Sequence, residues 1–571
     1  MKKLLLFLSV FALCTQGIDA KSITPEQAMV IAKQQMANTS KFNASNVKMT
    51  LNYAAMNLKG QTDYYVFNRD GGQGYVIVSG DDVAMPVLGY SNQGSFDYDQ
   101  APDGLKFLLE QYQYQMEWLR IHPEDALKQN RDLGYVAEML TTRWHQEPPY
   151  NESCPRISGT PNSNGRAYTG CAANALAQIM KFWRHPETGF GENSYTHVLD
   201  GVETTFSSVF SDHTYDWTRM RNTYTGSSSE TIWQKEALNT LIRDVDIALN
   251  MRYYADGSEA YYRDIVKALI AYFDYAPDIQ FLMRDNYYGD WSSLILNEID
   301  EGRPVYYFGN KTKDSQGNNV NIGHAYILDG HDQQGKVHVN WGFKIDYNGW
   351  FSLDMLSPKP ASQYEYDQYA EGFNGKSGAI IGIHPDNSGM GGIVMKGGIN
   401  IYADTMPNND VRASFDVQAL NGPYQGTIRY AIAAKTSEGY ENYYTFTKQV
   451  DLAKDEIMTI DLSGNYPYLY DGRTYYIIIW SPYFPNNYSW NWYFTNPVPF
   501  TIGDWVTPPF ILGDVNDDGF VTIADVTLLI SKVLKNADYV EAGDMNGDGE
   551  LTIADVTFLI SYVLKHGGGE E

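Results

Sequence analysis

The chain has 571 residues, of which 43% are hydrophobic. This length exceeds what a single hydrophobic core supports and predicts about three to four domains. Its formal net charge of −27 argues against a nucleic-acid partner, because no basic stripe could neutralise phosphates.

The first twenty residues, 1–20, have the form of a signal peptide. They begin with a methionine and two lysines, continue in an apolar run from Leu4 to Leu13, and end in a small residue. Such a run is too short to span a bilayer, and no other segment comes near the required apolar length. We therefore expect a secreted or extracellular protein without a membrane span. Of the three cysteines, only Cys154 and Cys171 remain after the leader.

Residues 21–130 have the pattern of a mixed α+β unit. The expected elements are two helices, at 25–36 and 105–119, and two strands, at 63–67 and 74–79. The unit is followed by a polar stretch, 126–132, which includes Lys128 and Arg131. Exposed stretches of this kind are preferred sites of proteolysis. We therefore predict that the chain is cut here.

A single cysteine lies where a helix is expected to begin. Cys171 follows Thr169 and Gly170, and the next residues are strong helix formers with apolar residues spaced for one buried face. A helix N-terminus stabilises a thiolate and provides N–H donors for an oxyanion. The pattern predicts a nucleophile, with a small core residue as the alternative. Because a disulfide to Cys154 would silence a nucleophile, we expect Cys154 to be unpaired.

Further polar residues along the chain have the types that a thiol nucleophile needs. His324 lies at the start of a strand-like run, and a second short strand ends in Asn340 and Trp341. Paired as a hairpin, the two strands would bring the Asn340 amide oxygen beside the His324 ring and fix its tautomer. Trp341 would shield this hydrogen bond from water. Upstream, Gln146 would supply a second oxyanion donor beside the N–H of Cys171.

The order Gln, Cys, His, Asn-Trp is the papain-like arrangement. Over roughly residues 22–385 the chain resembles the streptopain family of secreted cysteine peptidases, apart from Phe343, where members often have a second tryptophan. The matching motifs are TGCAANALAQIMKFWRHP, GRPVYYFG, GHAYILDG, HVNWGF, GFNGKSGAIIGIHP and, nearer the N-terminus, GYVIVSGDD with VLGYSNQGSFD. The resemblance implies a papain-like α+β catalytic domain at 131–386 and an inhibitory prosegment at 21–130. An independent adhesion module is the alternative for the N-terminal unit.

The resemblance also implies a role for each residue in covalent acyl transfer. The Cys171 thiolate attacks the scissile carbonyl, and Gln146 with the Cys171 N–H holds the oxyanion. His324 protonates the leaving amine and then activates water, while Asn340 orients the ring. Two further residues are expected to line the substrate cleft, Gly323 and Trp341. No cofactor is expected for catalysis, and the partners are protein or peptide substrates and the chain's own prosegment.

The sequence pattern changes at residues 387–507. Short strand-like runs, such as 427–432 and 475–480, alternate with turn residues, which predicts a β-sandwich. We find no cluster of catalytic residue types in this sequence. One aromatic group is either a carbohydrate platform or part of core and inter-domain packing, and it consists of Tyr488, Trp490, Trp492, Tyr493 and Phe494.

The C-terminal segment 511–567 contains an internal repeat. The units read GDVNDDGFVTIADVTLLISKVL and GDMNGDGELTIADVTFLISYVL, each an acidic loop followed by one amphipathic helix. Oxygen ligands at alternate loop positions with a glycine at the sixth predict calcium binding. The candidate ligands are Asp514, Asn516, Asp518, the Phe520 carbonyl, Thr522 and Asp525, then Asp544, Asn546, Asp548, the Glu550 carbonyl, Thr552 and Asp555.

This repeat resembles a type I dockerin. The resemblance implies a small α-helical domain with structural calcium, docked to a cohesin module of a scaffold or surface protein. Positions ten and eleven of the loops are Ile523-Ala524 and Ile553-Ala554, where many dockerins have hydroxyl residues. The identity of the cohesin is therefore left open.

Together these features predict a multidomain, secreted cysteine endopeptidase that is made as a zymogen and attached through a dockerin. One alternative is an inactive relative that inhibits or adheres, against which the intact Cys171, His324, Asn340 and Gln146 argue. The other is a scaffold-borne binding protein whose β-sandwich recognises glycan or protein, with proteolysis auxiliary. A glycan-binding assay on the sandwich segment would separate the two functions.

Overall fold

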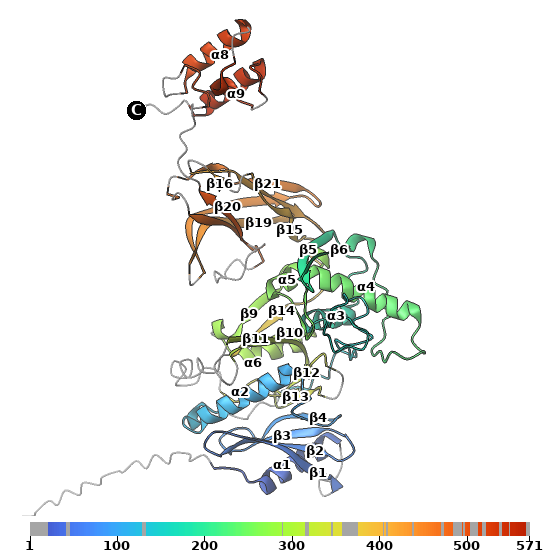
Figure 1. Ribbon diagram of the computed structural model, residues 1–571. Helices are drawn as coiled ribbons and strands as arrows, with labels where there is room; N and C mark the ends of the chain where they lie inside the picture. Colours follow the sequence, from blue (N-terminus) through green and yellow to red (C-terminus); the bar gives the residue numbers. More distant parts are fainter. Residues whose placement is uncertain are drawn as a thin grey trace, which may run out of the picture.

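The computed structural model divides into four parts that follow one another along the chain (Figure 1). They are an N-terminal domain (21–127), a central domain (133–385), a two-sheet domain (391–502) and a C-terminal helical pair (512–566). The structure describes residues 21–40, 46–127, 133–287, 289–313, 319–343, 347–356, 375–402, 405–406, 409–436, 439–466, 468–469, 473–483, 494, 497–502, 512–516, 521–535, 539–546 and 549–566. The leader 1–20 and the predicted cleavage residues Lys128 and Arg131 lie outside these ranges.

The N-terminal domain is a four-stranded antiparallel sheet with a helix on each face. Its elements are α1 (Pro25–Ser40), β1 (Met49–Met56), β2 (Thr62–Arg69), β3 (Tyr75–Ser79), β4 (Val87–Ser91) and α2 (Asp103–Leu119). Alternate residues of β2 and β3 contribute to two cores, one toward α1 and one toward α2. Because both faces are covered, all five residues of β3 are buried. The predicted helices and strands of this unit are present, with β1 and β4 in addition.

The strands of the N-terminal domain continue into the sheet of the central domain. The central strands are β9 (Gln280–Met283), β10 (Val305–Lys313), β11 (Asn319–His331), β12 (Val337–Asn340), β13 (Gly349–Phe351) and β14 (Gly375–Ile381). All ten form one antiparallel sheet in the order β1-β2-β3-β4-β13-β12-β11-β10-β14-β9. The junction pairs Trp350 with Tyr90 and Phe351 with Gly89. A Cβ on Gly89 would lie 2.6 Å from the Phe351 ring, so this close pairing depends on glycine.

Helices pack against the sheet of the central domain and build its second core. They are α3 (Cys171–Trp183), α4 (Ile232–Ala248), α5 (Tyr262–Lys267), which continues as a π-helical turn over Ala268–Tyr272, and α6 (Trp291–Asp300). Two small two-stranded sheets complete the described part of the domain. One is the hairpin of β5 (Glu192–Leu199) with β6 (Val202–Val209), and the other pairs β7 (Arg252–Tyr253) with β8 (Ser258–Glu259). Residues 172–180 of α3 are buried, and the apolar ones among them belong to the core that α3 shares with α4.

The two-sheet domain has one core between its sheets. One sheet contains β15 (Ile393–Ile401), β18 (Ala413–Ala419) and β21 (Ile457–Asp461); the other contains β16 (Thr405–Met406), β24 (Val498–Ile502), β23 (Thr474–Trp480), β19 (Tyr424–Thr436) and β20 (Gly439–Leu452), and β17 (Asp410–Val411) pairs with β22 (Gly464–Asn465). Asn421 donates to the Ile270 carbonyl (2.9 Å) and to Asp274 (2.7 Å), which joins this domain to the central one. Phe494 packs in the core, and the rest of the aromatic group lies outside the described residues.

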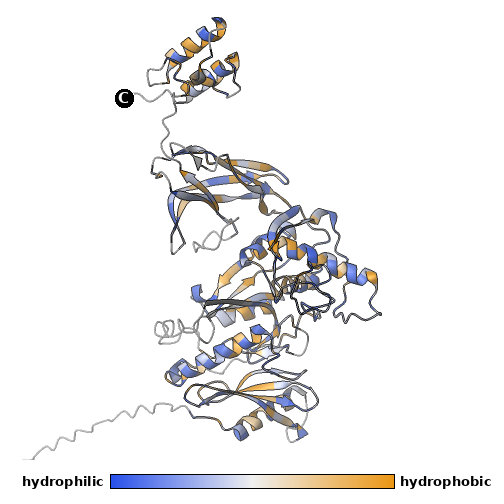
Figure 2. Cartoon of the chain, viewed as in Figure 1, coloured by the Kyte–Doolittle hydropathy of each residue, from blue (hydrophilic) through white to orange (hydrophobic). Residues whose placement is uncertain are grey.

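The C-terminal pair consists of α8 (Ile523–Lys535) and α9 (Ile553–His566) around a small core. Each helix follows one acidic loop, as the repeat predicts. Figure 2 shows hydrophilic and hydrophobic residues alternating along both helices. Among the described residues, no helix is both long and apolar enough to cross a bilayer.

Candidate active site

The predicted nucleophile lies at the first residue of α3. Gly170, immediately before it, has φ 82°, and a Cβ there would lie 3.0 Å from the Ser258 carbonyl oxygen. Only glycine fits this turn comfortably, and the turn places Cys171 at the positive end of the helix dipole. The Cys171 side chain is partly buried and forms no disulfide.

The histidine of the predicted pair lies beside this cysteine. His324, on β11, is buried, and its Nε2 lies 2.9 Å from the Trp341 carbonyl oxygen. Burial by itself raises the pKa of the Cys171 thiol, but the hydrogen bond to His324 and the imidazolium charge bring it below the usual value. Burial lowers the pKa of His324, and Cys171 with the Trp341 carbonyl raises it above the usual value. Both directions favour a thiolate–imidazolium pair.

The group that orients His324 differs from the prediction. Asn340 pairs with Ile327, three positions beyond His324 on β11, so the hairpin register does not bring its amide to the ring. Its Oδ1 accepts from the Gly342 N–H (3.1 Å), and its Nδ2 donates to the Thr142 carbonyl (3.2 Å). The backbone carbonyl of the next residue, Trp341, takes the expected place of the amide oxygen.

Trp341 is fully buried rather than open to a cleft. Its indole Nε1 donates to the Tyr347 carbonyl (3.0 Å), and its ring packs on Tyr326 with centroids 4.6 Å apart. Gly323, the other predicted cleft residue, is exposed and pairs with Asn310 of β10. In this state of the chain, therefore, only Gly323 of the two is accessible.

Gln146 belongs to a loop that is tied to the nucleophile turn. Its backbone carbonyl accepts from the N–H of Thr169 (3.3 Å), two residues before Cys171. Its side chain is partly buried. This link keeps the Gln146 segment and the start of α3 together, as an oxyanion donor requires.

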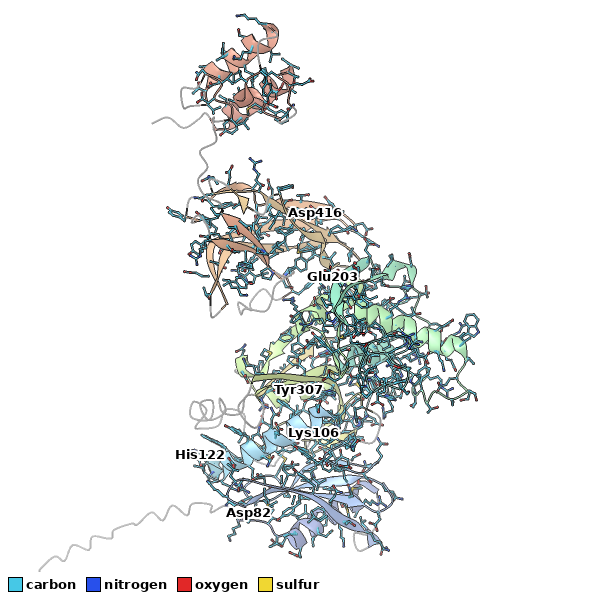
Figure 3. All side chains as sticks on the ribbon, in the orientation of Figure 1. Asp82, Lys106, His122, Glu203, Tyr307 and Asp416 are labelled. Atoms are coloured by element: carbon cyan, nitrogen blue, oxygen red, sulfur yellow. The ribbon has the colours of Figure 1, made fainter. Side chains whose placement is uncertain are left out.

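The first turn of α2 covers the histidine. A Cβ on Gly104 would lie 2.7 Å from Cδ2 of His324 and 2.9 Å from the Trp341 ring. One turn along, Phe107 packs on Gly309 of β10, where a Cβ would lie 2.6 Å from its ring. Figure 3 labels Lys106 on α2 and Tyr307 on β10, the two elements that meet at this boundary. The N-terminal domain thus closes the site.

Hydrogen bonds fasten the N-terminal domain to the chain around β13. The Tyr112 hydroxyl donates to the Ser352 carbonyl (2.5 Å), and Gln115 bonds both Asp354 (2.8 Å) and the N–H of Met355 (2.7 Å). These contacts bury polar groups of both domains, so separating the domains exposes them to water together.

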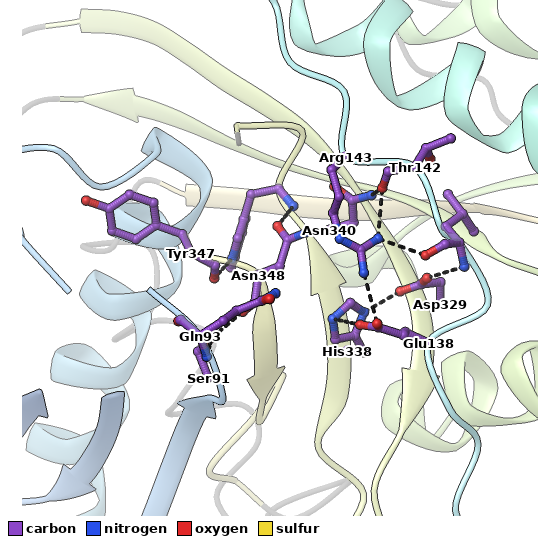
Figure 4. A network of polar contacts seen from close by, with 12 residues as sticks. Ser91, Gln93, Glu138, Thr142, Arg143, Asp329, His338, Asn340, Tyr347 and Asn348 are labelled. Atoms are coloured by element: carbon purple, nitrogen blue, oxygen red, sulfur yellow. Dashed lines mark hydrogen bonds and ion pairs between the residues drawn. The ribbon is translucent and has the colours of Figure 1, made fainter. Parts of the chain in front are cut away.

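A charged network that the sequence did not suggest holds the start of the central domain (Figure 4). His338 lies between two carboxylates, with Nδ1 2.6 Å from Asp329 and Nε2 2.9 Å from Glu138. Burial lowers the pKa of His338, but both carboxylates act against it and raise the pKa to about 9. The same Asp329 accepts from the N–H of Leu140 (2.8 Å), and Glu138 also pairs with Arg143 (2.9 Å). The network thereby anchors the segment that leads to Gln146.

The other cysteine is unpaired, as predicted. Cys154 is fully buried, and its thiol lies 3.6 Å from Asp246. Burial raises the pKa of this thiol well above its usual value, and the nearby carboxyl adds to the effect. Cys154 is therefore an inert core residue.

Each acidic loop has two buried carboxylates among its described residues. Four loop carboxylates are buried, at 7% exposure or less, and they belong to Asp514, Asp525, Asp544 and Asp555. Asp525 accepts from the N–H of Val515 (2.9 Å) and of Thr522 (2.8 Å), and Asp555 repeats the second contact with Thr552 (2.8 Å). Buried carboxylates gathered on a backbone loop fit the oxygen-ligand chemistry of calcium.

Some predicted ligands have other contacts or lie elsewhere. The hydroxyls of Thr522 and Thr552 accept from the N–H two residues on (3.1 and 3.2 Å), which caps α8 and α9. Asp518, Phe520 and Asp548 lie outside the described residues. Within the described part of the chain, no three acidic, histidine or cysteine side chains converge on one point. Asn516, Asn546 and Glu550 lie within the described part of the two loops.

Three family models match separate parts of the chain. Residues 144–351 match the Peptidase C10 family, residues 20–116 match the Spi protease inhibitor, and residues 512–564 match the dockerin type I domain. The matched ranges correspond to the central domain, the N-terminal domain and the C-terminal helical pair.

Several known proteins and solved structures are also similar to this chain. The thiol protease/hemagglutinin PrtT of Porphyromonas gingivalis is 30% identical over 77% of this chain, which spans about half (51%) of the length of that relative. Streptopain of Streptococcus pyogenes is 33% identical over 55% of this chain and 78% of streptopain. A prointerpain A fragment of Prevotella intermedia aligns with a TM-score of 0.47 and 26% identity, over 58% of this chain and 98% of the fragment. Active interpain A of the same organism aligns with a TM-score of 0.37 and 29% identity, over 45% of this chain and 97% of that one.

Proposed function

The chain belongs to the peptidase C10 family, and from this membership we propose that it is a secreted cysteine endopeptidase made as a zymogen. The observation that carries the proposal is the pair formed by Cys171 and His324 at the N-terminus of α3. Its thiol pKa is lowered and its imidazole pKa is raised, the combination that keeps a nucleophilic thiolate beside a proton donor.

The proposed reaction is a two-step acyl transfer. The Cys171 sulfur attacks the scissile carbonyl carbon, and the N–H of Cys171 with the side chain of Gln146 stabilises the oxyanion. His324 gives its proton to the leaving amine as the carbon–nitrogen bond breaks. It then takes a proton from the water that hydrolyses the thioester. The Trp341 carbonyl, 2.9 Å from Nε2, keeps the other ring nitrogen directed at the sulfur.

We assign the parts of the chain accordingly. Residues 21–130 are the inhibitory prosegment, 131–386 the papain-like catalytic domain, 387–507 a β-sandwich and 511–567 a dockerin. The contact of Gly104 with the His324 ring supports latency, because a substrate backbone has no room beside the histidine while α2 is in place. Cleavage near Lys128 and Arg131 would free the prosegment.

The dockerin is proposed to attach the enzyme to a cohesin of a scaffold or surface protein. Asp514, Asn516, Asp525 and their counterparts in the second loop would hold calcium, with Asp518 and Asp548 completing the loops. When bound, calcium would offset the mutual repulsion of these carboxylates. The ions have no part in the proposed acyl transfer.

Labelling of the nucleophile tests the function. The activated full-length protein is treated with an irreversible thiol-directed peptidase inhibitor, and the modified peptide is mapped. We expect modification of Cys171 alone and complete loss of hydrolysis, whereas Cys154→Ala should keep most activity. Cys171→Ala should also leave the precursor uncut. A modified Cys154, or hydrolysis that survives Cys171→Ala, would show that the site assignment is wrong.

A further inference from the structure

Two amide side chains lie on the nucleophile helix next to the active site. Asn174 and Gln178 of α3 are 1% and 0% exposed. They follow Cys171 by three and seven positions, which places all three on one face of the helix. An amide buried in an apolar core destabilises the fold unless it is hydrogen-bonded. The partners of these two amides therefore indicate what they hold in place.

Asn174 joins two loops through one nitrogen. Its Nδ2 donates to the Trp144 carbonyl (3.3 Å) and to the Gly342 carbonyl (3.0 Å). Gly342 has φ 62°, and a Cβ there would lie 2.6 Å from this same nitrogen. The turn after β12 approaches the helix this closely because residue 342 has no side chain.

Gln178 holds the same two loops through one oxygen. Its Oε1 accepts from the N–H of Trp144 (3.3 Å) and from Nδ2 of Asn340 (3.1 Å). The peptide groups on both sides of Trp144 are thus bound to α3, one through its N–H and one through its C=O. Asn340 in turn accepts from the N–H of Gly342 (3.1 Å). We call Asn174, Gln178 and Asn340 the amide bracket.

The side-chain amides of Asn174 and Gln178 can each be oriented in only one way. The Asn174 nitrogen faces two carbonyl oxygens, and the Gln178 oxygen faces two N–H groups. Rotating either amide by half a turn would place like groups against each other. The bracket is therefore directional, and neither a carboxylate at 174 nor an apolar side chain at 178 can reproduce it.

We propose that the amide bracket is the positioning device that sets both halves of the catalytic machinery against the nucleophile. Through Trp144 it fixes the backbone two residues before Gln146, the oxyanion donor. Through Asn340 and Gly342 it fixes the Trp341 carbonyl that accepts from His324. The inference rests on the proposed function, and it assigns Asn340 a role through the backbone rather than on the ring.

The test compares bracket variants with a matched amide elsewhere in the central domain. Asn174→Leu removes the donor, and Gln178→Met removes the acceptor at similar volume. The control is Asn193→Leu, because the Asn193 nitrogen also donates twice, to the Ile247 carbonyl (2.6 Å) and to Asn250 (2.9 Å), away from the site. For each activated full-length variant we measure kcat, KM, Tm and the pH dependence of alkylation by iodoacetamide.

Both bracket variants should lower kcat by about 10- to 100-fold with little change in KM, because a displacement of about 1 Å can cost about 100-fold. The midpoint of Cys171 alkylation should move to higher pH, since a displaced Trp341 carbonyl no longer supports the imidazolium. Asn193→Leu should lose comparable Tm while kcat and the alkylation midpoint stay at wild-type values. Gln178→Glu, which keeps an acceptor oxygen, should retain more kcat than Gln178→Met.

An unchanged alkylation midpoint in both bracket variants would overturn the proposal, whatever happens to Tm. Equal losses of kcat in the bracket variants and in Asn193→Leu would also overturn it, because the bracket would then be ordinary core structure. If the wild-type protein hydrolyses no peptide but the midpoint still moves, the proposed function fails and the bracket stands. The alkylation readout thus separates the two claims.

Discussion

Replacing His338 with glutamine should loosen the segment that leads into the active site. The histidine is 2% exposed and lies between Asp329 and Glu138 (Figure 4). Burial lowers its pKa, but the two carboxylates raise it from 6.5 to about 9. Asp329 also accepts from the N–H groups of Met139, through its backbone carbonyl (2.9 Å), and Leu140, through its carboxylate (2.8 Å). The charge of His338 is therefore coupled to the order of this segment.

The size and sign of the effect follow from the pKa. A rise from 6.5 to about 9 corresponds to about 3 kcal/mol of folding free energy. Because the folded pKa is the higher one, the stabilisation is complete below about pH 6.5 and is lost as the pH rises through about 9. The pKa of Glu138 is lowered by its hydrogen bond to His338 despite burial. Its contribution is thus lost in acid, and the network is strongest between these limits.

Hydrogen exchange of the peptide 133–143 measures the local stability of this segment. The protein is a full-length Cys171→Ala precursor, which cannot cut itself. At pH 6.5, His338→Gln should speed exchange of the Met139 and Leu140 amides by about 100-fold, the equivalent of about 3 kcal/mol. Wild-type protection, corrected for intrinsic exchange, should fall between pH 6.5 and 9, and that of the variant should stay flat. His213→Gln, which removes a histidine–aspartate pair elsewhere (2.8 Å to Asp244), is the control. Wild-type protection that does not depend on pH would refute the reasoning.

Four further predictions concern other parts of the chain. Gln146→Ala should lower kcat by roughly 100- to 1,000-fold, as for other oxyanion donors, and wild-type turnover would remove Gln146 from the mechanism. Burial raises the pKa of Asp246 well above its usual value, so ionising this carboxyl destabilises the folded protein as the pH rises. Asp246→Asn should therefore raise Tm near pH 8 and leave it unchanged near pH 3. A variant with the same Tm as the wild type at both pH values would contradict this. Chelation, or Asp514→Ala with Asp544→Ala, should lower the thermal stability of the C-terminal pair measured by circular dichroism, because the proposed calcium would bind only its folded state. Peptide hydrolysis should persist, and an unchanged melting curve would exclude calcium. Gly104→Val would crowd the His324 ring and weaken the packing of α2 on it, so the uncleaved precursor should become partly active in a peptide assay. Full latency of this variant would mean that α2 does not block the proposed site.

Local signals predicted where Cys171 lies in the fold. Gly170 before a run of helix formers was enough to place Cys171 at the start of α3, because a positive φ and helix propensity are properties of a few adjacent residues. The pairing of β11 with β12 was also predictable from two apolar runs and a turn.

Contacts that depend on register were not predictable. The hairpin pairs Asn340 with Ile327, three positions beyond His324, so the amide lies away from the His324 ring, and a register shift between Leu328 and Gly330 sets this pairing. Sequence spacing carries no information about such a shift. The same limit explains why the Trp341 carbonyl was missed as the group that orients the histidine.

Polar residues inside apolar patterns were missed for a different reason. His338 stands between two valines in a short strand, and Asn174 and Gln178 stand among the alanines of α3. Periodicity treats them as interruptions of a buried face. A buried polar residue needs a partner, so these interruptions were themselves the signal that a network lay there. Its members come from segments far apart in the chain, which a single sequence does not connect.

The continuous ten-stranded sheet has a consequence for the proposed removal of the N-terminal domain. Removal of the N-terminal domain takes away four strands and leaves β13 with unpaired backbone groups, next to the aromatic rings of Trp350 and Phe351. An exposed edge strand with unpaired N–H and C=O groups can pair with another extended chain. If the N-terminal domain is removed as proposed, this strand edge would be exposed together with the His324 ring. The removed domain would match this edge in register, through Tyr90 opposite Trp350 and Gly89 opposite Phe351, and could pair with it again.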